Sequence, residues 1–147
     1  MKILKLDYNE CIEKGLLRRT IASEEKAKRS ILKSEKLLSD AKKNKDMNVL
    51  DGTVILAYMS MFHAVRSVLI RDGFREKSHV CLVRYIEEFY AKENKLDMRV
   101  INLLDRFRNI RHDDQYDIDF TPTEKDADEM LAFAEECINI FKKLIKN

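Results

Sequence analysis

VLDGTVILAYMSMFHAVRSVLIR, residues 49–71, is the most apolar stretch of the chain, and only a few polar side chains such as His63 and Arg66 interrupt it. It is apolar on nearly every side of a helical wheel, so neighbouring helices or a second copy of the protein must bury it. The two cationic positions leave it short of a membrane span. We therefore expect a central buried helix, which Asp72-Gly73 ends because glycine is common just past a helix.

Amphipathic segments flank this run on both sides. We expect helices over residues 8–19, 23–44, 78–92 and 96–113, the second and third of them capped by Ser23 and Ser78. A last helix opens at TPTE, with Thr121 as N-cap, Pro122 in the first helical position and Glu124 closing a capping box.

The composition agrees with helices throughout. The chain has 147 residues, which suits one domain with a real core, here residues 1–147. It holds 3 Gly and 1 Pro, too few to punctuate many short strands, and charged residues make up 37%. The sequence predicts an all-α bundle of five or six helices.

Charge and cysteine content limit the function classes. The net charge of +2 is too small to indicate a nucleic-acid binder by charge alone. Cys11, Cys81 and Cys137 are far apart, form no C-x-x-C pair and follow no secretory leader. We expect reduced thiols in a cytoplasmic protein that has no membrane segment.

The stretch RFRNIRHDDQY, residues 106–116, holds three arginines and a histidine within seven residues. Arg108 and His112 are four apart, so on a helix they lie one above the other. A guanidinium can hold a phosphate while an imidazole moves a proton near neutral pH, which is the equipment for cleaving RNA without a metal. A solvated helix end with paired charges is the other interpretation, and spacing alone favours it.

Two further groups carry chemistry. His63 and Arg66 lie three apart on the buried helix, where they either form hydrogen bonds within the bundle or face a cleft. Lys77, Ser78 and His79 stand at a helix start, where free backbone N–H groups favour an anion, although capping by Ser78 explains them equally well. The histidines show no paired metal-ligand spacing, so we expect no metal and no cofactor.

The segment AYMSMFHAVRSVLIRDGFREKSH, residues 57–79, followed by RFRNIRHDDQYD, residues 106–117, resembles the HEPN domain of small stand-alone archaeal and bacterial proteins. The shared features are an A-Y-x-x-M-F-H-A-x-R-x-L helix, a G-x-x-x-K-S-H turn and a closing R-x-x-x-D-Y segment. Arg111 and Tyr116 fit the last of these, with Gln115 where aspartate is common. The likeness covers roughly residues 8–145.

This resemblance implies an up-and-down bundle of four main helices plus one or two short ones, usually a homodimer. Many HEPN proteins are metal-independent RNases whose R-x(4–6)-H motifs meet at the dimer interface. Arg106 and His112 enclose five residues and fit that count, whereas helical geometry favours Arg108, so both arginines stay as alternatives. Other members are partners of a minimal nucleotidyltransferase, which in some pairs adenylylates a tyrosine just after the motif; here that tyrosine is Tyr116.

The sequence hypothesis is thus a metal-independent endoribonuclease, the toxin of a HEPN/nucleotidyltransferase toxin–antitoxin module that acts on RNA. His112 is general base or acid, Arg106 or Arg108 is the phosphate clamp, and Arg111 and Tyr116 are accessory. The residues expected to line the cleft or contact phosphate are His63, Arg66, Lys77, Ser78 and His79. The alternative is a non-catalytic module that binds a nucleotidyltransferase or a nucleotide.

Overall fold

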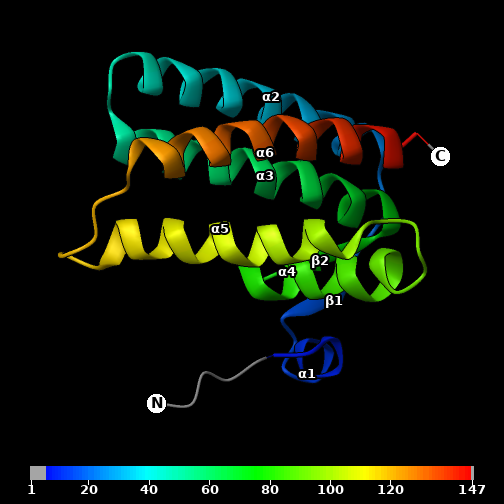
Figure 1. Ribbon diagram of the computed structural model, residues 1–147. Coiled ribbons are helices and arrows are strands. Elements are labelled where there is room, and N and C mark those ends of the chain that lie inside the picture. Colours follow the sequence, from blue (N-terminus) through cyan, green and yellow to red (C-terminus); the bar gives the residue numbers. More distant parts are fainter. Residues whose placement is uncertain (1–5, 147) are drawn as a thin grey trace.

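The computed structural model describes residues 6–146, which form a helical bundle with one short two-stranded sheet (Figure 1). In chain order the elements are α1 (Tyr8–Glu13), β1 (Leu17–Arg19), α2 (Glu24–Asp46), α3 (Leu50–Asp72), β2 (Phe74–Glu76), α4 (His79–Ile86), the π-helix η1 (Glu87–Ala91), α5 (Met98–Tyr116) and α6 (Glu124–Leu144). Four long helices, α2, α3, α5 and α6, make up the bundle. The predicted fold class, an all-α bundle of four main helices with short additional ones, is confirmed.

Helix α3 is the centre of the molecule and contacts α2 and α6 as well as α4 and α5. It has the length and hydropathy of a membrane span, but 67% of its apolar window is buried inside the protein. That burial is what a core helix requires, because neighbours cover nearly all of its sides. The helix ends at Gly73, as predicted, and the φ of Gly73 is 83°, the left-handed conformation that glycine adopts readily.

Helices α2 and α3 approach each other through small side chains. The small residues buried on the two helices include Ala27, Ser30, Ser34, Ala41, Ala57, Ser60, Ala64 and Ser67. The hydroxyl of Ser60 donates to the Ser34 carbonyl at 2.8 Å, and that of Ser30 donates to the His63 carbonyl at 2.7 Å. Buried hydroxyls need such partners, and helix carbonyls supply them across the narrow interface.

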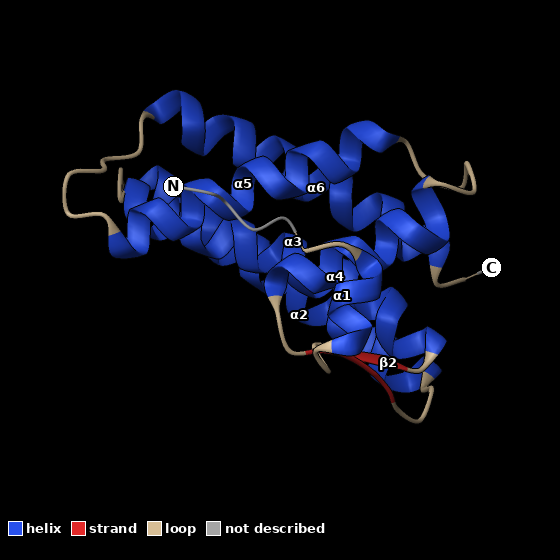
Figure 2. Ribbon diagram, turned by 90° about the horizontal axis from the view of Figure 1, so that it is seen from below, coloured by secondary structure: helices blue, strands red, loops and turns tan. Residues whose placement is uncertain are grey.

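The N-terminal segment differs from its prediction. Helix α1 ends at Glu13, and residues 17–19 are not helical but form β1, antiparallel to β2 with Leu17 opposite Glu76. Gly15, with a φ of 68°, makes the turn between helix and strand. Figure 2 shows this ribbon at one edge of the molecule. A three-residue strand depends on its distant partner, so local periodicity could not predict it.

The expectation of three reduced thiols is wrong for two of them. Cys11 of α1 and Cys81 of α4 form a disulfide across 70 residues of sequence. Cys137 is a free thiol, fully buried in the core, and its burial raises its pKa. No motif spacing joins cysteines so far apart, because the fold alone brings them together. The cytoplasmic location, which rested partly on reduced thiols, stays a prediction.

The remaining helix boundaries follow from their caps. Ser78 caps α4 by accepting the Cys81 amide at 3.3 Å, as predicted. Helix α4 then continues as η1 to Ala91, so the helix expected over residues 78–92 changes its hydrogen-bonding pattern after Ile86.

The cap of α6 was placed two residues too early. Its N-cap is Thr123, not Thr121, and the capping box closes with Asp126, not Glu124. Thr123 and Asp126 exchange side-chain-to-backbone hydrogen bonds at 3.0 Å in both directions. Pro122 therefore lies before the helix, where no intrahelical hydrogen bond requires a backbone N–H.

Candidate functional site

Helix α5 carries the motif RFRNIRH. The side chain of Asp97 caps its N-terminus, and one side of the helix packs into the bundle through Val100, Ile101, Leu104 and Phe107. The burial of that side fixes the direction of every other side chain, because successive residues of a helix are rotated by about 100°. The motif cations are therefore held on defined flanks of a rigid helix.

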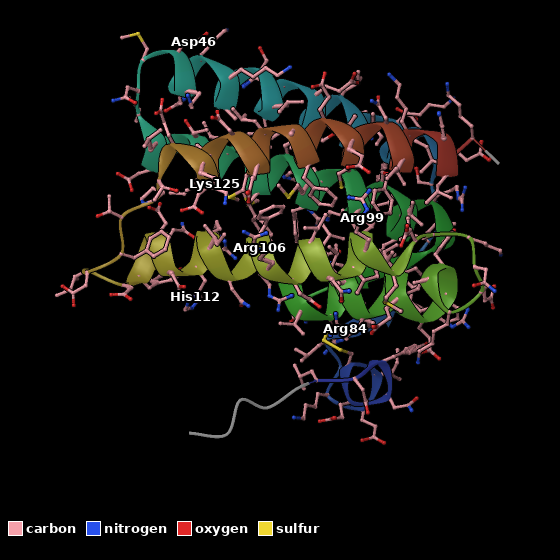
Figure 3. All side chains as sticks on the ribbon, in the orientation of Figure 1. Asp46, Arg84, Arg99, Arg106, His112 and Lys125 are labelled. Atoms are coloured by element: carbon pink, nitrogen blue, oxygen red, sulfur yellow. A yellow bond between two sulfur atoms is a disulfide. The ribbon has the colours of Figure 1, made fainter. Side chains whose placement is uncertain are left out.

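Arg106 and His112 lie on different flanks of α5. Arg106 faces α6, where its guanidinium lies 3.0 Å from the Glu129 carboxylate (Figure 3). His112 lies on the side away from α6, near the end of the helix (Figure 3). The pair that fits the motif count is thus not together within one copy of the chain.

Arg108 lies on the flank that faces α4. It is 2.6 Å from Asp105, and the same carboxylate accepts from Arg84 of α4, also at 2.6 Å. Asp105 thus holds two guanidinium groups, and the Arg108 side chain is only 15% exposed. A fixed guanidinium loses little conformational entropy when it binds a phosphate. The sequence did not assign Arg84 to the site, because its position on α4 fits a helix surface.

His112 is open to solvent, with 64% of its side chain exposed. Its ring centre lies 4.8 Å from that of Tyr116, one turn further along the helix. The Asp113 carboxylate is 3.9 Å from Nδ1, a contact too long and too exposed to hold the ring firmly. An imidazole in this position can exchange protons with a bound molecule.

Arg111 brings the three motif segments together. Its guanidinium lies over the Tyr58 ring at 4.8 Å, bonds Gln115 at 2.6 Å and reaches to 3.5 Å from Nδ1 of His79. The Tyr58 hydroxyl is 2.9 Å from the same nitrogen. Helices α3, α4 and α5 therefore meet at the His79 ring. No local signal in the sequence paired Arg111 with His79.

The electrostatics of this cluster keep His79 neutral. Burial and, after it, the positive charges of Arg111 and Arg108 together lower the pKa of His79 to about 4. Burial raises the pKa of Tyr58 to about 12, so its hydroxyl keeps its proton. Because Tyr58 and Arg111 both offer hydrogens to Nδ1, the ring proton of His79 belongs on Nε2.

The other cleft residues predicted from the sequence surround Phe62. The His79 ring stacks on it at 4.4 Å, and the His63 ring meets it edge-on at 5.4 Å. Burial, assisted by the charge of Arg66, lowers the pKa of His63. Arg66 itself lies 3.0 Å from Glu76 of β2.

Lys77 and Ser78 take simpler roles. Lys77 is exposed, and Ser78 is occupied by its capping bond to α4. Within residues 6–146, no three His, Cys, Asp or Glu side chains lie close enough together to hold a metal ion.

The family model described as the HEPN domain matches residues 27–144. The chain belongs to the HEPN family. The matched region runs from the first turns of α2 to the end of α6, so α1 and β1 lie outside it. The Cys11–Cys81 disulfide consequently ties a segment outside the HEPN match to α4, two residues from His79.

Curated relatives of this HEPN protein come from archaea. "Putative toxin MJ0142" of Methanocaldococcus jannaschii is 25% identical over 99% of this chain and 88% of the relative. "Putative toxin MJ0605" of the same organism is 26% identical over 90% of this chain and 97% of the relative. A UPF0332 protein of Archaeoglobus fulgidus is 41% identical over a shorter stretch, 33% of this chain and 39% of the relative.

Proposed function

We propose that this HEPN protein is a metal-independent endoribonuclease and the toxin of a HEPN/nucleotidyltransferase toxin–antitoxin module. The observation that carries the proposal is the exposed imidazole of His112, one helical turn from an arginine that Asp105 holds in place. The names of the two full-length relatives support the toxin role.

Arg108 suits the phosphate clamp better than Arg106. Arg106 is paired with Glu129 on the side of α5 that faces α6, away from His112. Arg108 is one turn before His112 on the helix. It shares the Asp105 carboxylate with Arg84, which leaves some of the N–H groups of its guanidinium for a phosphate.

The reaction follows from these two groups. His112 accepts the proton of a ribose 2′-hydroxyl, and the 2′-oxygen attacks the adjacent phosphorus. The bond from phosphorus to the 5′-oxygen then breaks. The leaving 5′-oxygen takes a proton from His112 of a second copy of the protein, which starts the reaction protonated. The products are a 2′,3′-cyclic phosphate and a free 5′-hydroxyl. Arg108 stabilises the charge that develops on the phosphate oxygens.

The test is cleavage of total RNA in EDTA by the purified protein. We expect His112→Ala to lower the rate by at least about 100-fold, as for loss of a general base, and Arg108→Ala to act in the same direction. Arg99→Ala is the matched control, because Arg99 is an exposed arginine of α5 that pairs with Glu136 of α6. A wild-type protein that is folded, dimeric and inactive would refute the nuclease.

The second candidate function is a binding module for a minimal nucleotidyltransferase, and Tyr116 favours it. This tyrosine is 68% exposed at the end of α5, so its hydroxyl is open to an enzyme that transfers a nucleotide. Incubation with a minimal nucleotidyltransferase and ATP should add the mass of an adenylyl group, and Tyr116→Phe should prevent it. An unchanged mass in the wild-type protein would reject this function.

A further inference from the structure

A cavity of about 550 Å³ opens at one end of the bundle, between the first turns of α2 and the last turn of α6. The end of α3 also reaches this place, whereas the turn between α5 and α6 lies at the opposite end of the bundle (Figure 1). His112 lies toward that opposite end (Figure 3). The volume is within the range of small-molecule sites, about 300 to 1,000 Å³. The cavity is therefore large enough for a ligand and distant from the motif RFRNIRH.

The walls of this cavity are mainly apolar. Ala27 and Ile31 of α2 are buried and form its floor, and Ile145 is half-buried on the side of α6. Leu32 also lines the cavity and is 64% exposed. An apolar ligand seated here would remove the leucine side chain and its buried neighbours from water, which favours binding in proportion to the apolar area covered.

Cations outnumber acids around the cavity. Four cations line it against two carboxylates: Lys28, Arg71, Lys142 and Lys146 against Glu24 and Glu35. Lys142 lies 3.5 Å from Glu35, and Arg71 donates to the Tyr90 hydroxyl at 2.7 Å. Lys28 and Lys146 are exposed, and neither has an ion pair within residues 6–146. Two ammonium groups, one from α2 and one from the end of α6, are thus available at the rim for a negative charge.

We propose that this cavity binds a small organic anion with an unbranched apolar body, such as a medium-chain carboxylate. The carboxylate lies at the rim with Lys28 and Lys146, and the alkyl chain lies along Ala27, Ile31 and Leu32. Both parts are needed, because exposed ammonium groups bind a small anion only weakly in water. The site does not depend on nuclease activity, since none of these residues belongs to the motif of α5.

A titration of the full chain with octanoate, followed by NMR of the backbone amides, tests the site. We expect the amides of Ala27, Ile31 and Ile145 to shift and those of His112 and Tyr116 to stay unchanged. Hexanoate is shorter by two methylenes and should bind about tenfold more weakly, because less apolar surface leaves water. Octylammonium has the same chain and the opposite charge, so it should also bind more weakly than octanoate.

Surface variants separate the charge from the apolar wall. The double variant Lys28→Gln, Lys146→Gln should weaken octanoate binding by about fivefold. Its matched control is Lys26→Gln, Lys143→Gln, which removes the same charge from exposed neighbouring positions outside the cavity and should leave the affinity unchanged. Leu32→Asn changes an exposed position, so the fold is retained, and it should also weaken octanoate binding.

Three results would overturn the proposal. The first is the absence of amide shifts around the cavity at about 5 mM octanoate, where even a Kd of about 1 mM fills most sites. The second is octylammonium that binds as tightly as octanoate. The third is equal affinity of the two double variants for octanoate. Because RNA cleavage is not part of these measurements, failure of the nuclease would leave their outcome unchanged.

Discussion

Two layers of the bundle are held together by different kinds of contact. The apolar layer, α2, α3 and α6, packs through alanines, serines and larger apolar side chains. In the networked layer, α1, α4, η1 and α5, a disulfide joins α1 to α4, and Asp105 binds Arg84 and Arg108. Asp72, at the end of α3, connects to this layer by accepting from Tyr85 and Tyr90 at 2.8 and 2.6 Å. The apolar layer is therefore stabilised by the close packing of its side chains. The networked layer depends on specific hydrogen bonds and ion pairs, and the candidate site lies among the residues that form them.

The largest effect should come from removing the disulfide of the networked layer. A crosslink across 70 residues restricts the unfolded chain, so the double variant Cys11→Ser, Cys81→Ser should lose about 4 kcal/mol of unfolding free energy. Chemical denaturation measures this loss. The wild type with a reductant should behave like the double variant, whereas reductant should not change the double variant itself. A loss below about 1 kcal/mol would show that α1 is held mainly by other contacts.

The apolar layer should be sensitive to added volume where α2 and α3 meet at Ser60. Ser60 is fully buried between α2 and α3, so Ser60→Leu forces the two helices apart and should cost about 2 kcal/mol. Ser60→Ala is the matched control, because it removes the hydrogen bond to Ser34 without adding volume and should cost about 1 kcal/mol or less. Equal losses for the two variants would mean that the hydrogen bond, not the close approach, determines this interface.

The same division explains what the sequence could predict. The periodicity of apolar residues predicted α2, α5 and α6, because a helix face that is buried must be apolar over many turns, and the long run that is apolar on nearly every side predicted α3. The left-handed Gly73 and the Ser78 cap were also predictable, since each is a local backbone requirement. These features depend on neighbours in sequence.

The features that were not predicted depend on partners distant in sequence. The strand β1 exists because β2 pairs with it, and Cys11 meets Cys81 only after α1 folds onto α4. Nothing in the sequence around Arg111 indicated that its guanidinium would contact Tyr58 and His79. Long-range pairs of this kind require the three-dimensional arrangement, so the site was predicted as separate motifs and not as one cluster.

The smallest effect should appear where the two layers meet, at Asp114 of α5 and Asp51 of α3. Burial, reinforced by a hydrogen bond to Asp51 and by its charge, raises the pKa of Asp114 to about 7. One carboxylate oxygen of Asp114 is buried without a partner. The folded protein therefore holds a proton that the unfolded chain releases near pH 4, its ordinary value.

This proton makes stability depend on pH. Between about pH 4 and pH 7 the folded state binds more protons than the unfolded state, so the unfolding free energy falls as pH rises and levels off above pH 7. Asp114→Asn should remove this slope and stabilise the protein at pH 8 by about 1 kcal/mol, a value reduced for partial exposure to solvent. Asp113→Asn, at the exposed neighbouring position, is the control and should keep the wild-type slope. If the unfolding free energy of Asp114→Asn falls from pH 5 to pH 8 as steeply as that of the wild type, Asp114 does not hold a proton beside Asp51 in the folded state.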